Sequence, residues 1–231
     1  MSLLGNVLTV GGATLVSRVL GFVRDAVTAA VLGGGPVADA FFVAFRLPNL
    51  FRRLFAEGAF ASAFVPMLVE VRDREGADAA RRFSGEAALA LLATIALLTV
   101  PAMVFAPEVV RLLAPGFAAD PGKLALTATL ARICLPYLAC ISVVALLAGA
   151  LGTDRRFLAA ATAPILVNTV LIATLLGLLV RHGDDARAGV LLSLAVTAAG
   201  LLQVAVLGVA DRKSTRLNSS HTDISRMPSS A

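Results

Sequence analysis

The 231 residues contain no tryptophan, one tyrosine, two histidines and two cysteines. His182 and His221 fall in polar segments, so nothing indicates a histidine-based catalytic centre. Cys134 and Cys140 lie in one apolar stretch, where a helix would set them about 120° apart, and two cysteines alone cannot form a metal site. We therefore expect two free thiols in the core, and neither a metal ion nor a cofactor.

Charge is also scarce. Charged residues make up 15% of the chain and hydrophobic residues 58%, whereas soluble domains carry about 25% charged residues. The mean hydropathy is +0.87. This composition excludes an ordinary soluble domain and is typical of a protein that crosses the membrane several times. Because tryptophan is absent, the usual aromatic belt at the membrane surface is weak.

Six apolar stretches are long enough to cross a bilayer, which takes about 20 residues in a helix. They cover 4–32, 38–68, 85–105, 124–151, 158–180 and 189–210. Proline removes a backbone hydrogen bond, so we expect kinks at Pro48 and Pro136. The segments 71–82 and 107–122 are predicted loops. The predicted fold class is all-α, a polytopic membrane bundle of six transmembrane helices.

The orientation follows from basic residues in short loops, which concentrate on the cytoplasmic side. With the N-terminus inside, the inner loops hold eight such residues and the outer loops four. The inner ones are Arg72, Arg74, Arg81, Arg82, Arg155, Arg156, Arg212 and Lys213; the outer ones are Arg111, Lys123, Arg181 and Arg187. We therefore predict a cytoplasmic N-terminus.

The last segment, 211–231, differs abruptly from the rest. It is polar, rich in serine and without hydrophobic periodicity, and it resembles translated adapter sequence. We predict that it is foreign and disordered, and that 1–210 form one six-helix lobe; the alternative is a disordered cytoplasmic tail. The net charge of +5 falls to +3 without this segment. Such a charge is ordinary in a membrane protein and indicates no nucleic-acid partner.

The stretch 17–66 combines apolar character with an unusual density of charge. It carries Arg18, Arg24, Asp25, Asp39, Arg46, Arg52, Arg53 and Glu57. Each arginine at mid-bilayer costs roughly 2.5–3.5 kcal/mol on insertion, while a leucine contributes only about 0.3–0.6 kcal/mol. We therefore expect these arginines to face a water-filled cavity or the bundle interior, where charged residues are functional by default.

The spacing of these residues places several of them together. Asp39, Arg46 and Arg53 recur every seven residues, so they drift by only about 20° per step and share one helix face. Asn49 lies near the same stripe. Glu57 follows Arg53 by four residues and can pair with it.

The predicted helix over 4–32 adds Arg18 and Arg24, with Ser17 beside them. The two arginines are some 120° apart on a straight helix, but a bend at Gly21 could bring both to one cavity. We predict a cationic cavity between the first two predicted helices. Arginine suits a polyanion there because its planar fork binds phosphate oxygens bidentately and stays charged.

Some polar residues have another interpretation. Arg52, Arg53 and Glu57 could snorkel to the cytoplasmic face as an anchor. Asn168 could bond a carbonyl freed by Pro164, or point into the cavity. We predict helix-packing roles for Thr94, Thr99, Ser142, Thr169, Thr174, Ser193, Thr197 and Gln203.

Four motifs carry a family resemblance. They are SRVLGFVRDAV at 17–27, DAFFVAFRLPNLFRRLFAEGAFASAFVP at 39–66, APGF at 114–117, and the P-x-x-x-N pattern that ends at Asn168. Together they resemble the MurJ/MviN family of lipid II flippases, within the superfamily of multidrug, oligosaccharidyl-lipid and polysaccharide exporters. The second motif is long and highly specific, and the resemblance covers 3 to about 210.

The resemblance implies a bacterial inner-membrane protein with two six-helix lobes around a central cavity, of which this sequence supplies only the first. It implies that rocking lobes move undecaprenyl-pyrophosphate-linked disaccharide-pentapeptide from the inner to the outer leaflet for peptidoglycan synthesis. The expected partners are this lipid-linked pyrophosphate, membrane lipids and the missing C-terminal lobe. The implied substrate-binding residues are Arg18, Arg24, Asp39, Asn49, Arg52 and Arg53, and secondary candidates are Ser17, Arg46, Glu57 and Asn168. Asp39 would orient or gate an arginine.

Two alternatives stay open. A related polysaccharide or drug exporter fits the helix count, but does not account for the R-L-P-N-x-x-R-R block at 46–53. An intramembrane enzyme acting on prenyl phosphates also clusters arginines, but it usually needs a nucleophile, a general base or acidic metal ligands. We therefore expect a transporter and not an enzyme. The chain has no G-x-x-x-x-G-K loop, so we do not expect direct use of ATP.

Overall fold

The computed structural model describes residues 3–54, 60–153, 157–181 and 185–224, with side-chain surroundings for 11–50, 62–151, 161–180 and 186–210. Every regular element within those ranges is helical, which confirms the all-α expectation. The elements are α1 (Leu3–Leu32), α2 (Pro36–Leu54), α3 (Phe60–Glu75), α4 (Ala77–Val104), α5 (Ala106–Leu113), the short 3-10 helix η2 (Pro115–Ala119), α6 (Pro121–Cys134), α7 (Tyr137–Thr153), α8 (Phe157–Arg181) and α9 (Asp185–Ile224).

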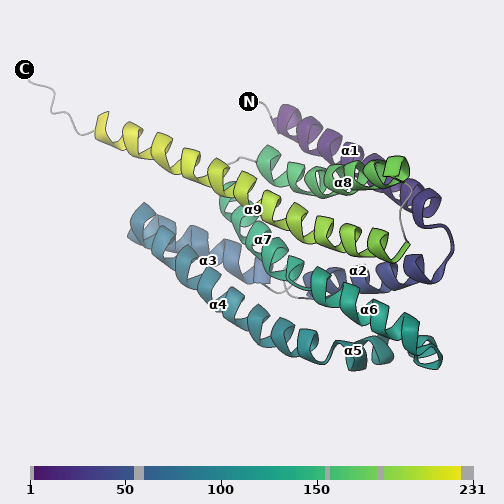
Figure 1. The fold of residues 1–231 in the computed structure, drawn as a ribbon. Coiled ribbons are helices and arrows are strands. Elements are labelled where there is room, and N and C mark those ends of the chain that lie inside the picture. Colours follow the sequence, from purple (N-terminus) through teal and green to yellow (C-terminus); the bar gives the residue numbers. More distant parts are fainter. Residues whose placement is uncertain (1–2, 55–59, 154–156, 182–184, 225–231) are drawn as a thin grey trace, which may run out of the picture.

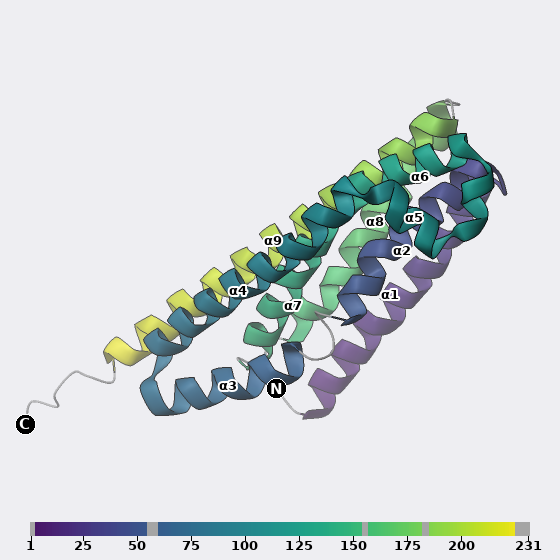
Figure 2. The same ribbon diagram turned by 90° about the horizontal axis from the view of Figure 1, so that it is seen from below.

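The helices form an elongated bundle in which helices adjacent in sequence are often not adjacent in space (Figures 1 and 2). α1 packs along α8 and barely touches α2, while α2 lies mainly against α6. α7 contacts α4, α8 and α9, and α3 packs chiefly on α4. Fully buried leucines, among them Leu47, Leu130, Leu138 and Leu192, fill the region where α2, α6, α7 and α9 meet. Burial of such side chains stabilises this centre by roughly 1.5–3 kcal/mol each.

The expected kink at Pro136 is a full break between α6 and α7. Proline has no backbone N–H, and the chain tightens here, with Leu138 N donating to Leu135 O at 2.9 Å. The hydroxyl of Thr197, on α9, donates to Ile133 O at 2.6 Å. A side chain from a neighbouring helix thus satisfies a carbonyl at the end of α6, as the predicted packing role of Thr197 requires.

Other predicted boundaries differ from the structure. The stretch 38–68 is two helices, because α2 continues through Pro48 to Leu54 and α3 begins at Phe60. The predicted loop over 71–82 is helical except for Gly76, whose φ of 90° only glycine adopts readily. The loop over 107–122 contains α5 and η2. The stretch 71–82 carries exposed charged residues such as Arg74 and Arg81, and α5 and η2 are short, so hydropathy did not predict these helices.

Four stretches of the described chain are long and apolar enough to cross a membrane: Ala77–Val104, Pro121–Leu151, Ala161–Val180 and Ala186–Ala210. The other two expected spans carry the charged residues of 17–66, so the count of six stays a prediction. The sequence predicts that the last helix ends at about Ala210, but the backbone of α9 continues to Ile224. The foreign origin of 211–231 stays a prediction, which sequencing the source DNA would test.

Candidate functional site

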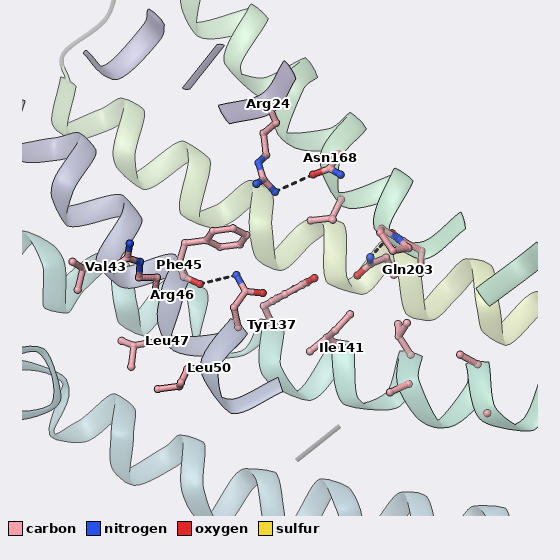
Figure 3. A pocket seen from close by; sticks show the side chains of 18 of the residues that line it. Arg24, Val43, Phe45, Arg46, Leu47, Leu50, Tyr137, Ile141, Asn168 and Gln203 are labelled. Atoms are coloured by element: carbon pink, nitrogen blue, oxygen red, sulfur yellow. Dashed lines mark hydrogen bonds between the residues drawn. The ribbon is translucent and has the colours of Figure 1, made fainter. Parts of the chain in front are cut away.

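A cavity of about 1000 Å³ opens among α2, α7, α8 and α9 (Figure 3). Its lining is mostly apolar, with residues such as Ile141 and Val144 on α7 and Val167 on α8. Six polar side chains interrupt this lining: Arg24, Arg46, Asn49, Tyr137, Asn168 and Gln203. An apolar cavity with a few convergent polar groups is the usual form of a binding site for a small or lipid-linked molecule.

Arg24 is the most constrained of these residues. Its Nη1 donates to Asn168 Oδ1 at 2.9 Å, and its Nη2 and Nε donate to Asp25 Oδ1 at 2.7 and 3.0 Å. The guanidinium carbon lies 5.7 Å from the centre of the Phe45 ring, within range of a cation–π contact. The side chain is only 21% exposed. These hydrogen bonds use three of the five N–H donors of an arginine, which leaves donors for an anion.

Asn168, on α8, orients Arg24 of α1 through this hydrogen bond. It is buried in α8, and its Nδ2 donates to the Ser17 carbonyl oxygen of α1 at 3.2 Å. The amide therefore bonds α1 twice, once through its oxygen and once through its nitrogen. Of the two roles that the sequence left open for Asn168, pointing into the cavity is the one seen. Figure 3 shows Arg24 and Asn168 facing one another at one side of the cavity.

The seven-residue stripe on α2 is split in the structure. Arg46 and Asn49 line the cavity, and Asn49 Nδ2 donates to the Phe45 carbonyl at 3.1 Å. Asp39 lies elsewhere: its Oδ2 accepts from Lys123 Nζ at 2.6 Å. Asp39 thus pairs with a lysine of α6, where the sequence led us to expect it to orient an arginine.

Arg18 does not join Arg24. It is exposed on a face of α1 that also bears the exposed side chains of Leu15, Val19 and Phe22. α1 is one continuous helix through Gly21, so the 120° between the two arginines is retained. Ser17 contributes its backbone carbonyl rather than a cavity side chain.

Three candidates cannot be placed at the side-chain level. Arg52 and Arg53 lie in the last turn of α2, but the structure does not describe their side chains. Glu57 lies outside the described residues altogether. Their binding roles stay predictions.

Three polar residues at or near the site were not predicted to belong to it. Lys123 neutralises Asp39 and lies 4.2 Å from the centre of the Phe117 ring. Tyr137 and Gln203 line the cavity, although we expected only packing from Gln203. The available signals were the position of the single tyrosine directly after Pro136 and the one amide side chain in the apolar stretch 189–210.

Among the described residues, no three His, Cys, Asp or Glu side chains come together as a group that could hold a metal ion. Cys134 and Cys140 are free and buried, as expected. The polar chemistry that the cavity offers is therefore that of arginines, amides and one phenol.

A family model described as "Lipid II flippase MurJ" matches residues 28–224. The chain is 51% identical over 213 residues to a probable lipid II flippase MurJ of Rhizobium meliloti, covering 92% of this chain and 40% of that relative. It is 42% identical over 173 residues to the lipid II flippase MurJ of Burkholderia cenocepacia, covering 75% of this chain and 34% of the relative.

A solved structure, titled lipid II flippase MurJ in an inward closed conformation, matches with a TM-score of 0.64 and 25% sequence identity. The match covers 85% of this chain and 41% of the solved one. This chain therefore spans about 40% of the length of the relatives it resembles.

Proposed function

The chain belongs to the MurJ family of lipid II flippases, and we propose that it forms the N-terminal lobe of a transporter that moves a lipid-linked pyrophosphate across the bacterial inner membrane. The substrate would be undecaprenyl-pyrophosphate-linked disaccharide-pentapeptide, and its destination the outer leaflet. Family membership, four membrane-compatible stretches and a largely apolar cavity that contains arginines all support this proposal.

The single observation that carries the proposal is the position of Arg24. An arginine in an apolar bundle is retained only where water, a partner or a ligand compensates its charge. Asp25 and Asn168 engage part of the guanidinium, and the rest can face the cavity. Arg46 adds a second guanidinium to the lining from α2. Two forked cations in a largely apolar cavity favour a ligand with several phosphate oxygens.

Transport requires the charged headgroup to leave water for this cavity while the prenyl tail stays in lipid. Donors from Arg24 and Arg46 would replace the hydration of the pyrophosphate. Rocking of this lobe against the missing C-terminal lobe would then open the cavity to the other side. The membrane potential favours outward movement of an anion by about 2.3 kcal/mol per charge per 100 mV, so it could drive the step without ATP.

The face of α1 that carries Arg18 suits contact with that second lobe. Leu15, Val19 and Phe22 are each more than half exposed on it, and Arg18 lies among them. The charge of Arg18 is compensated if this face lines a water-filled cavity between the two lobes rather than contacting lipid. Arg18 would then reach the substrate only when the two lobes are assembled.

We also propose that the chain performs no covalent chemistry. The polar groups described in the cavity lining are guanidinium, amide and phenol groups, which suit binding. Proton transfer or nucleophilic attack usually relies on a carboxylate, histidine or thiol held near the ligand. An enzyme acting on prenyl phosphates would show turnover of the lipid by the purified chain, and we expect the lipid to be recovered unchanged.

Complementation tests the proposed function. Residues 1–210 would replace the corresponding segment of the R. meliloti relative, and the chimaera would be expressed in cells depleted of their own flippase. We expect growth with the unmodified chimaera and loss of growth with Arg24→Ala. Arg74→Ala is the control, because Arg74 is exposed on α3 and pairs with Glu70 of the same helix, at 3.0 Å. Equal growth of both variants at equal membrane levels would refute the role of Arg24.

A further inference from the structure

Tyr137 is held in place by a glycine on the helix behind it. This sole tyrosine opens α7, lines the cavity and is 4% exposed. A Cβ at Gly200 of α9 would lie 2.6 Å from Cδ2 of the ring and 3.2 Å from Cε2. The ring therefore rests directly on the α9 backbone, and only a residue without a side chain permits that approach. Figure 3 shows the hydroxyl end of Tyr137 pointing into the cavity.

Gln203 lies one turn further along α9 and carries an unused acceptor. It is 1% exposed, and its Nε2 donates to the Ala163 carbonyl of α8. Its Oε1 is buried and has no hydrogen-bond partner in the part of the chain that the structure describes. A buried acceptor without a partner destabilises the empty site, and a ligand that supplies a donor removes that penalty. Gln203 thus indicates a ligand with a hydroxyl or N–H group.

These two residues give the cavity a neutral side. The guanidinium groups come from α1 and α2, while Tyr137 and Gln203 come from α7 and α9 (Figure 3). A phenol donates and accepts, and an amide oxygen accepts, so this side matches uncharged polar groups. The volume of about 1000 Å³ also exceeds the space that a pyrophosphate alone would fill.

We infer that Tyr137 and Gln203 bind the uncharged saccharide part of the headgroup, through its hydroxyl and amide groups, while Arg24 binds the pyrophosphate. This inference rests on the proposed function and adds to it the residues that distinguish a glycosylated lipid from a bare prenyl pyrophosphate. Gly200 is a positioning residue in this arrangement, since it acts only through the Tyr137 ring.

The test compares two lipids on the full 231-residue chain in lipid nanodiscs. One is undecaprenyl pyrophosphate, and the other is the same lipid carrying an N-acetylated disaccharide. Tyr137→Phe removes the hydroxyl and keeps the ring. Gln203→Met removes the acceptor at similar volume, together with the Nε2 donor to Ala163, whose loss affects both lipids alike. Loss of one neutral hydrogen bond should lower affinity for the disaccharide lipid about three- to tenfold. Affinity for the bare lipid should stay within about twofold.

Ser193→Ala is the matched control, because Ser193 is a buried hydroxyl of α9 outside the cavity lining described above. We expect it to change neither affinity. If Tyr137→Phe and Gln203→Met lower both affinities equally, or neither, the saccharide assignment is overturned while pyrophosphate binding stands. If the unmodified chain binds neither lipid, the proposed function falls and this inference with it.

Discussion

Nζ of Lys123 lies 2.6 Å from Oδ2 of Asp39, so an ion pair joins the first turn of α6 to the first turn of α2. The position of Asp39 in the first turn of α2 is also favourable in itself, because the helix dipole stabilises a carboxylate there. Lys123 gains a second contact from the Phe117 ring, whose centre is 4.2 Å away. Three segments, α2, η2 and α6, thus meet at one lysine.

We expect this pair to contribute modestly to stability. A double-mutant cycle of Lys123→Met and Asp39→Asn should give a coupling free energy of about 0.5–1 kcal/mol, since Asp39 is half exposed. The measurement is thermal unfolding in detergent at low salt, and the coupling should shrink at high salt. The pair Arg111–Glu108, at 3.5 Å with both side chains more than half exposed, is the control and should show less coupling. A coupling no larger than that of the control would contradict the account.

The charge balance at Arg24 yields a second prediction. Asn168→Asp keeps the shape of the side chain but places a carboxylate against Nη1 of Arg24. This carboxylate would compete with the pyrophosphate, so affinity for undecaprenyl pyrophosphate should fall about tenfold or more, as expected for loss of a charge-assisted contact. Asn168→Leu removes only the orienting amide and should have a smaller effect. An Asp variant that binds as tightly as the unmodified chain would rule out Arg24 as the anion site.

A third prediction concerns the close approach of α9 to α7. Gly200→Ala places a Cβ 2.6 Å from the Tyr137 ring and 2.8 Å from Cys140 Cβ. Such overpacking typically destabilises by about 1–3 kcal/mol, so the unfolding temperature should drop. Gly208→Ala, on the same helix with nothing within 4 Å of the new Cβ, should be neutral or slightly stabilising. Equal unfolding temperatures for the two variants would show that α7 and α9 are not packed as described.

The predicted orientation can be checked by cysteine accessibility. The turn between α1 and α2 and the junction of α3 and α4 lie at opposite ends of the bundle (Figure 2). If the N-terminus is cytoplasmic, a membrane-impermeant reagent should label Gly34→Cys in intact cells, and Glu75→Cys only after permeabilisation. Both positions are exposed. The reverse labelling pattern would mean that the N-terminus faces outward.

Hydropathy and the energetics of buried charge predicted much of this structure. The apolar stretches located most of the helices, and the insertion penalty pointed to the arginines of 17–66 as a group. Of these, Arg24 and Arg46 line the cavity, whereas Arg18 does not. The P-x-x-x-N pattern pointed to Asn168, which bonds Arg24. The stripe on α2 correctly grouped Arg46 with Asn49 at the cavity. These features depend on local spacing or on composition, which a single sequence contains.

Contacts between distant segments could not be predicted. Periodicity shows which face of a helix is apolar, but not which helix covers it, so the packing of α1 on α8 instead of α2 was missed. The same limit hid the partner of Asp39, because Lys123 is 84 residues away. For the same reason the role of Gly200 was not predicted, since the Tyr137 ring that packs against it is on another helix, α7.

The most direct test of the central claim is the affinity of the 231-residue chain, in nanodiscs, for undecaprenyl pyrophosphate. A charge-assisted hydrogen bond contributes about 1.5–3 kcal/mol, so Arg24→Ala should weaken binding by roughly one to two powers of ten. Arg24→Lys should recover only part of the loss, because it keeps the charge without the fork. Arg74→Ala should bind like the unmodified chain. If Arg24→Ala binds as tightly as Arg74→Ala, Arg24 is not the anion-binding residue and the proposed site is wrong.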